Sequence, residues 1–135
     1  PSQLVLRLNT IFSAFDKLAE DYQLEKIKTI GDAYMLVGGL PKARPDHAEA
    51  VAAMALDMLH VIRTLQSQDD DPFDIRIGIH TGPVIAGIIG TKKFAYDLWG
   101  DTVNTASRME SHGKAGTVHI SADAYGYLKE QFLCQ

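Results

Sequence analysis

The sequence contains a single cysteine, Cys134, among its 135 residues. One cysteine excludes an internal disulfide framework and suits a reducing compartment, so we expect a cytoplasmic domain, whether or not its parent protein is anchored to a membrane. No apolar run reaches membrane-spanning length, and there is no signal-peptide pattern. Acidic residues also outnumber basic ones, 17 to 13. The net charge of −4 and the lack of a basic run exclude nucleic acid as an expected partner.

Hydrophobic residues make up 46% of the chain and charged residues 22%, which is typical of a soluble globular domain. We predict a single domain spanning residues 1–135 with one substantial core. Helical and strand-like periodicities alternate along it, which favours an α+β architecture with helices packed on a mixed sheet. We expect one helix up to about Tyr22, a second from Pro45-Asp46 onward, and a last one from a Ser121 cap to about Phe132. The expected strands are 24–30, 33–39, 74–81, 84–89 and 117–120.

Two apolar runs flank Gly31-Asp32, within the stretch Glu25–Met35. A two-residue Gly-Asp connection between such runs is typical of a tight β-hairpin, and glycine can adopt the positive φ that the turn requires. The carboxylate of Asp32 would then project from a rigid tip, where it suits Mg²⁺, an ion that demands near-ideal octahedral geometry. The alternative is that Asp32 is an ordinary turn residue.

A second informative stretch runs from Phe94 to Glu110. Gly100-Asp101-Thr102 predicts a helix start with Asp101 or Thr102 as N-cap, and Gly113 lies where a C′ glycine would end the helix. Asn104 and Arg108 are four residues apart and share one helix face. An amide and a guanidinium on one face suit a phosphate and ribose clamp. The alternative is a solvated face on which Arg108 pairs with Glu110 or a distant acid.

Other charged or polar groups have simpler interpretations. The acidic run 69–71 is expected to be a solvent-exposed loop rather than a cation site. His80 lies on a sheet face, where a histidine is more often structural than catalytic. Gly87 is expected to allow the close approach of another backbone, because no helix follows directly as a phosphate-binding loop requires. Lys92 and Lys93 either attract a triphosphate or are simply solvated.

Three segments in this order resemble the class III purine nucleotide cyclases, the adenylate and guanylate cyclase catalytic domains. They are Glu25–Met35, Arg76–Gly90 and Tyr96–Glu110, and residues 1–16 resemble the family's first helix. The resemblance implies a ferredoxin-like palm core and a head-to-tail homodimer with shared active sites. It further implies that the family's first strand, with one metal-binding aspartate, and its C-terminal hairpin, with a phosphate-binding lysine, lie outside these 135 residues. We therefore expect that this exact chain lacks a complete site.

The same resemblance implies roles for individual residues. An aspartate at the position of Asp32 binds the two catalytic Mg²⁺ (or Mn²⁺) ions. The residue at Asn104 orients the ribose, and the one at Arg108 stabilises the charged phosphorus in the transition state. Lys28 and Asp97 occupy the positions that read the purine edge, with the backbone around Leu98 bordering the base.

Adenylate cyclases resemble this chain in having a lysine and an aspartate at the positions of Lys28 and Asp97. A lysine only donates hydrogen bonds and an ionised aspartate only accepts them, which complements the ring nitrogens and amino group of adenine. We therefore expect ATP as the substrate and cyclic AMP as the product. The alternatives are a guanylate cyclase and a non-catalytic nucleotide-binding or dimerisation module.

Overall fold

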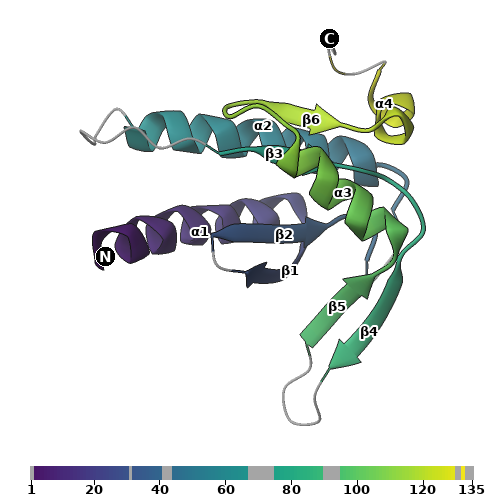
Figure 1. Ribbon diagram of the computed structural model, residues 1–135, viewed down its shortest axis with the longest axis horizontal. Coiled ribbons are helices and arrows are strands. Elements are labelled where there is room, and N and C mark those ends of the chain that lie inside the picture. Colours follow the sequence, from purple (N-terminus) through teal and green to yellow (C-terminus); the bar gives the residue numbers. More distant parts are fainter. Residues whose placement is uncertain are drawn as a thin grey trace.

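The computed structural model describes residues 2–30, 32–40, 44–66, 75–89, 95–129 and 132. Helices and strands alternate along these residues, in the arrangement of Figure 1. In chain order the elements are α1 (Ser2–Tyr22), β1 (Glu25–Ile30), β2 (Ala33–Val37), α2 (His47–Gln66), β3 (Ile77–Ile79), β4 (Ile85–Ile89), β5 (Ala95–Trp99), α3 (Asp101–Ser111), β6 (Val118–Ile120) and α4 (Ala122–Leu128). Within the described ranges, no helix is both long enough and apolar enough to cross a bilayer.

Helix α2 is the central packing element, because two of its faces are apolar. Four residues at i, i+4, i+8 and i+12 spacing pack against α1 and the β1–β2 hairpin; they are Ala50, Met54, Met58 and Ile62. Ala48, Ala52 and Ala55 pack on another side against Ile79 of β3 and against α4. Two hydrophobic clusters therefore meet at one helix.

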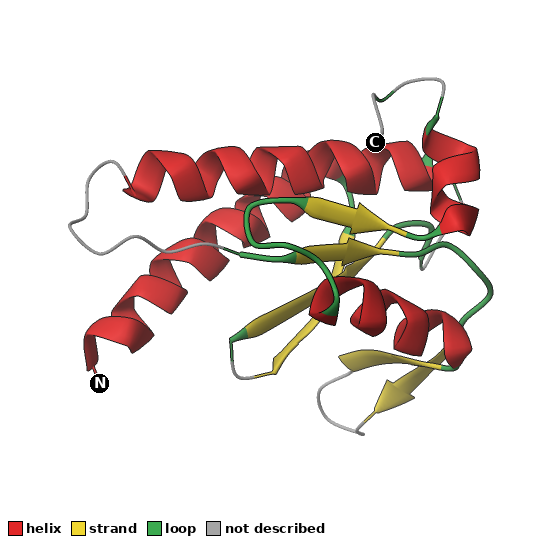
Figure 2. Cartoon of the chain, turned by 45° about the horizontal axis from the view of Figure 1, so that its top comes forward, coloured by secondary structure: helices red, strands yellow, loops and turns green. Residues whose placement is uncertain are grey.

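Three two-stranded pairs make up the sheet structure of the described residues. The β1–β2 and β4–β5 pairs are antiparallel, and β3–β6 is parallel. The β3–β6 pair lies between α2 and α3, while the β4–β5 pair extends beyond it at the start of α3 (Figure 2). Parallel and antiparallel pairing with helices packed against them confirms the predicted α+β class.

Several predicted boundaries need correction. The strand expected at 74–81 is confined to Ile77–Ile79, and the last helix ends at Leu128 rather than near Phe132. Helix α2 begins at His47, so Pro45 and Asp46 precede it instead of forming its first turn. The Ser121 cap is confirmed, since its hydroxyl accepts a hydrogen bond from the backbone N–H of Ala124 at 3.2 Å. The acidic run 69–71 and the pair Lys92 and Lys93 lie outside the described residues.

Candidate active site

The predicted hairpin is present. Ile30 pairs with Ala33, so the connection between β1 and β2 is two residues long. Asp32 lies at this tip and is exposed to solvent. Gly31 falls outside the described residues, so the prediction about its φ angle stays a prediction. An exposed carboxylate at the end of a short connection is accessible to a hydrated cation.

Strand β1 contains an irregularity that the sequence did not reveal. Lys26 pairs with Leu36, whereas Lys28 pairs with Met35, so Ile27 is an extra residue on β1. Such a bulge changes the direction of the side chains that follow it. Directly opposed residues share a face of the hairpin, and neighbours on one strand point to opposite faces. Lys26 and Lys28 therefore lie on opposite faces although they are two residues apart, and Lys28 is half-buried.

Strand β5 carries Asp97 and Leu98, which pair with Gly87 and Ala86 of β4. The side chains of these strands lie outside what the structure describes, so the predicted contacts of Asp97 and the predicted role of Gly87 are not tested. Strand β5 leads directly into α3 through Gly100, whose φ of 116° is a left-handed conformation suited to glycine.

The start of α3 differs from the prediction. Gly100 is the N-cap, and no side chain caps the helix. Asp101 and Thr102 are the first helical residues instead. The Thr102 hydroxyl donates its hydrogen bond to the carbonyl of Pro83. This contact joins the helix start to the loop after β3. At the other end, Gly113 does occupy the C′ position, since α3 ends at Ser111 with His112 as its C-cap.

Asn104 and Arg108 are both exposed on α3, four residues apart as predicted. Arg108 donates a hydrogen bond to the Thr105 hydroxyl at 3.1 Å. The alternative pairing of Arg108 with Glu110 is wrong, because Glu110 forms an ion pair with Arg76 at 3.1 Å. The guanidinium of Arg108 therefore stays at the surface, where it can meet an anionic ligand.

Helix α3 is fixed by an unusually close approach to β3. A Cβ added to Gly78 of β3 would lie 2.1 Å from the Glu110 nitrogen and 2.7 Å from the Ala106 carbonyl oxygen. Only glycine allows this backbone-to-backbone contact. Arg76 adds a hydrogen bond to the Ser111 carbonyl at 3.2 Å. Sequence reasoning missed Gly78, for which a glycine inside an alternating strand was the available signal.

The elements that carry the predicted residues adjoin one another. Strand β1, with Lys28, contacts β5, with Asp97 and Leu98, and β5 in turn contacts α3. Asp32 lies at the end of the hairpin that β1 begins. A cavity of about 420 Å³ is elsewhere, between α1 and β1, and none of the predicted site residues lines it. His80 binds Ser121 at 2.6 Å and thereby links β3 to the cap of α4, which supports its structural interpretation.

The metal role of Asp32 stays a prediction, and the described residues offer one carboxylate for it. In the part of the chain that the structure describes, no three acidic, histidine or cysteine side chains gather closely enough to hold a metal ion. Mg²⁺ is commonly bound by one or two carboxylates together with water and substrate phosphates. The exposed carboxylate of Asp32 fits one such ligand position.

Comparison with known proteins identifies the family and the fold of this chain. The family model described as the adenylate and guanylate cyclase catalytic domain matches residues 1–135. The chain belongs to this family. An adenylate cyclase of Mycobacterium tuberculosis is 47% identical over 133 residues, which cover 98% of this chain and 30% of that protein. This nucleotide cyclase domain thus spans about a third of the length of the curated relatives it matches first.

Two solved structures are similar over the whole chain. A dimeric guanylyl cyclase domain from the fungus Blastocladiella emersonii has a TM-score of 0.93 at 40% identity and is covered to 75%. The adenylyl cyclase CyaB from P. aeruginosa also has a TM-score of 0.93, at 30% identity, and is covered to 73%. The cyclase palm fold is therefore confirmed, while relatives of both nucleotide specificities match.

Proposed function

We propose that the chain is the catalytic domain of an adenylate cyclase, which converts ATP to 3′,5′-cyclic AMP and pyrophosphate. The observation that carries this proposal is the contact of β1 with β5, the strands of Lys28 and Asp97. Lys28 is half-buried, so a hydrogen bond from its ammonium group to an adenine ring nitrogen would be only partly screened by water. Asp97 would accept a hydrogen bond from the adenine amino group, and the backbone at Leu98 would border the base.

Asn104 and Arg108 would act on the rest of the nucleotide. The exposed amide of Asn104 would orient the ribose so that its 3′-hydroxyl faces the α-phosphorus. The hydroxyl oxygen forms the new bond to phosphorus, and the bond to pyrophosphate breaks. Arg108, one turn further along α3, would neutralise the charge that develops on the phosphate oxygens. Both residues lie on a helix that Gly78 and Arg76 fix against β3, which keeps their positions constant.

Asp32 would hold the divalent metal at the tip of the hairpin. When bound, two Mg²⁺ or Mn²⁺ ions would supply a lowered pKa for the ribose hydroxyl and charge neutralisation for the phosphates. Asp32 contributes one carboxylate to them, and a second carboxylate would come from outside the described residues. We further propose that two copies of the chain form a homodimer, in which Asp32 of one copy serves the site built from Lys28, Asp97, Asn104 and Arg108 of the other.

A guanylate cyclase is the second candidate, because a guanylyl cyclase domain matches this chain with a TM-score of 0.93. Guanine presents a carbonyl and an N–H at the corresponding edge, which Lys28 and Asp97 would match less well. A non-catalytic nucleotide-binding module is the third.

The test is the specificity ratio of the full-length protein, measured as kcat/KM for ATP and for GTP. We expect ATP to be preferred, and we expect the double variant Lys28→Glu with Asp97→Cys to reduce that preference at least tenfold. Each hydrogen-bonding group that the bound base would leave unpaired costs about 1–3 kcal/mol, and ~1.4 kcal/mol is a factor of ten. Lys17→Glu, the substitution made at Lys28 but placed at a side chain that is 75% exposed, is the control. An unchanged ratio in the double variant would exclude base reading by this pair, and nucleotide binding without product would indicate the non-catalytic module.

A further inference from the structure

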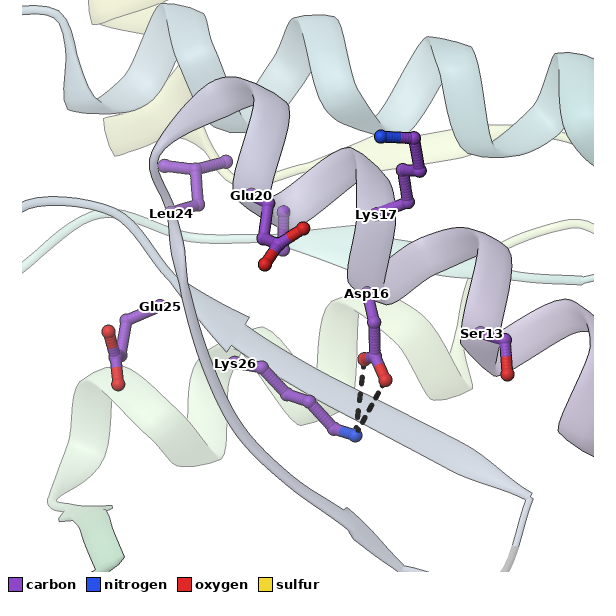
Figure 3. A pocket seen from close by; sticks show the side chains of 8 residues that line it. Ser13, Asp16, Lys17, Glu20, Leu24, Glu25 and Lys26 are labelled. Carbon is purple, nitrogen blue, oxygen red and sulfur yellow. Dashed lines mark hydrogen bonds and ion pairs between the residues drawn. The ribbon is translucent and has the colours of Figure 1, made fainter.

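One carboxylate on α1 binds both strands of the hairpin. Asp16 accepts a hydrogen bond from the Tyr34 hydroxyl of β2 at 2.7 Å. It also pairs with Lys26 of β1, whose Nζ lies 3.1 Å from one carboxylate oxygen and 3.3 Å from the other. Figure 3 shows Lys26 reaching from the hairpin to Asp16, while Lys17, on the same helix, points away from the hairpin. Asp16 therefore fixes β1 and β2 to the helix at the same point.

The hydrophobic core makes this point rigid. The Tyr34 ring packs against Phe12 at 5.4 Å and Phe15 at 5.5 Å between ring centroids. Phe15 is 2% exposed, so the tyrosine rests on a fully packed part of α1. Lys26 lies with its Nζ 5.4 Å from the centre of the same ring. Because Tyr34 cannot slide along α1 without breaking this packing, the hydroxyl and the ammonium group have one place at which both reach Asp16.

The bulge at Ile27 gives that contact a consequence for Lys28. Lys26 shares the α1-facing side of the hairpin with Leu36 and Tyr34, while Lys28 shares the opposite side with Met35. In a regular strand, two residues at i and i+2 would point to the same side. A register without the bulge would therefore turn Lys28 toward the side of α1 whenever Lys26 keeps its contact with Asp16.

We propose that Asp16 is a positioning residue for the nucleotide base: by holding Lys26 and Tyr34 on α1, it maintains the Ile27 bulge that directs Lys28 to the opposite face. This proposal rests on the proposed role of Lys28 in reading the base. Asp16 does not touch the nucleotide, and it acts only through the register of β1. Tyr34 and Lys26 are its two partners, one on each strand.

The experiment measures the ATP-to-GTP ratio of kcat/KM in the full-length protein for Asp16→Ala, Tyr34→Phe, Lys28→Ala and the double variant Asp16→Ala with Lys28→Ala. We expect Asp16→Ala and Tyr34→Phe to lower the ratio by about three- to tenfold, mainly through a higher KM for ATP. Asp21→Ala is the matched control. Asp21 is a 58% exposed aspartate of the same helix, 3.9 Å from Lys17. We expect its ratio to stay within about twofold of wild type.

The double variant separates positioning from mere stabilisation. If Asp16 acts through Lys28, adding Asp16→Ala to Lys28→Ala changes the ratio no further. A lower kcat for both nucleotides with an unchanged ratio would overturn the positioning role. A ratio that Lys28→Ala leaves unchanged would instead overturn the proposed function of Lys28. If a variant turns over neither nucleotide, the same ratio is taken from the Kd values of ATP and GTP by titration calorimetry. Tyr34→Phe keeps the aromatic ring in the core, so it tests the hydrogen bond even if Asp16→Ala folds poorly.

Discussion

The β1–β2 hairpin and helix α3 carry most of the predicted site, and they are attached to the molecule in different ways. The hairpin is attached through side chains. Tyr34 and Leu36 enter the core, and Lys26 reaches Asp16 through an ion pair whose side chains are 38% and 48% exposed. Helix α3 also has side-chain contacts, from Thr102 to Pro83 and from Glu110 to Arg76, but its main chain rests directly on Gly78, and none of its eleven residues, all of which are described, is buried.

This difference predicts how each region responds to substitution. A contact between half-exposed side chains is screened by water and contributes modestly, so the hairpin can adjust when one partner is removed. A backbone-to-backbone contact across a glycine has no side chain that can move away, so α3 must shift as a whole. We therefore expect Lys28 to shift when one side-chain contact of the hairpin is removed, whereas α3 keeps Asn104 and Arg108 in a fixed placement.

The largest expected effect is the loss of activity in Asp32→Asn. Asparagine keeps the size of the side chain but loses the negative charge that a metal-bound carboxylate supplies, so we expect at least a ~100-fold fall in cyclic nucleotide formation by the full-length protein. Because Asp32 is exposed at a hairpin tip, the thermal melting temperature should not change. Near-normal turnover in this variant, with Mg²⁺ or Mn²⁺ supplied, would contradict a metal-binding role.

Gly78→Ala should have the largest effect on stability. The added methyl group would meet backbone atoms of α3 at 2.1 Å and 2.7 Å, and such overpacking costs about 1–3 kcal/mol or more. Gly126→Ala is the matched control, because nothing lies within 4 Å of a Cβ added in α4. Alanine there should raise the free energy of unfolding by about 0.5–1 kcal/mol. Urea unfolding of both variants measures the difference, and equal effects would contradict the close approach of α3.

A smaller effect on the free energy of unfolding is expected in alkaline solution, through Tyr34. Burial, followed by the hydrogen bond to Asp16, raises the pKa of Tyr34 above its ordinary value of 10.0. The native state therefore favours the neutral phenol, whose contribution is fully present below about pH 10 and is lost as the pH rises through the native-state pKa. Between pH 9 and 11, wild-type stability should fall more steeply than that of Tyr34→Phe, by at most about 1.4 kcal/mol per pH unit and less with solvent screening. Parallel stability curves would show that Tyr34 does not titrate in this way.

Local sequence patterns predicted the elements better than the contacts between them. The Gly31-Asp32 hairpin, the i, i+4 pair Asn104 and Arg108, and the Ser121 cap follow from a few neighbouring residues, and their presence is confirmed. The predicted N-cap at Asp101 or Thr102 was wrong, because Gly100 is the N-cap and the Thr102 hydroxyl has its partner at Pro83, nineteen residues away. The predicted alternative pairing of Arg108 with Glu110 was likewise wrong, because Glu110 forms its ion pair with Arg76, which lies far from it in the sequence.

The Ile27 bulge and the role of Gly78 could not be predicted from the sequence, because both depend on which segments lie opposite each other in the fold. A bulge depends on which residues oppose each other across two strands, and here Asp16 of a separate helix contributes to that register. A glycine inside a strand indicates that another backbone approaches closely, but it does not indicate which segment that backbone belongs to. The choice between ATP and GTP is of this kind too, because on our proposal it would depend on where Lys28 and Asp97 meet the base.

The central claim, that the hairpin tip and helix α3 act together in one site shared between two copies, is tested most directly by complementation. Full-length Asp32→Asn and Arg108→Ala proteins, each inactive alone, are mixed and allowed to exchange subunits, and cyclic nucleotide formation is measured. We expect about a quarter of the wild-type activity, because random exchange makes about half of the dimers mixed and each mixed dimer has one whole site. A mixture that remains inactive, although exchange between differently tagged copies is demonstrated, would contradict the shared site.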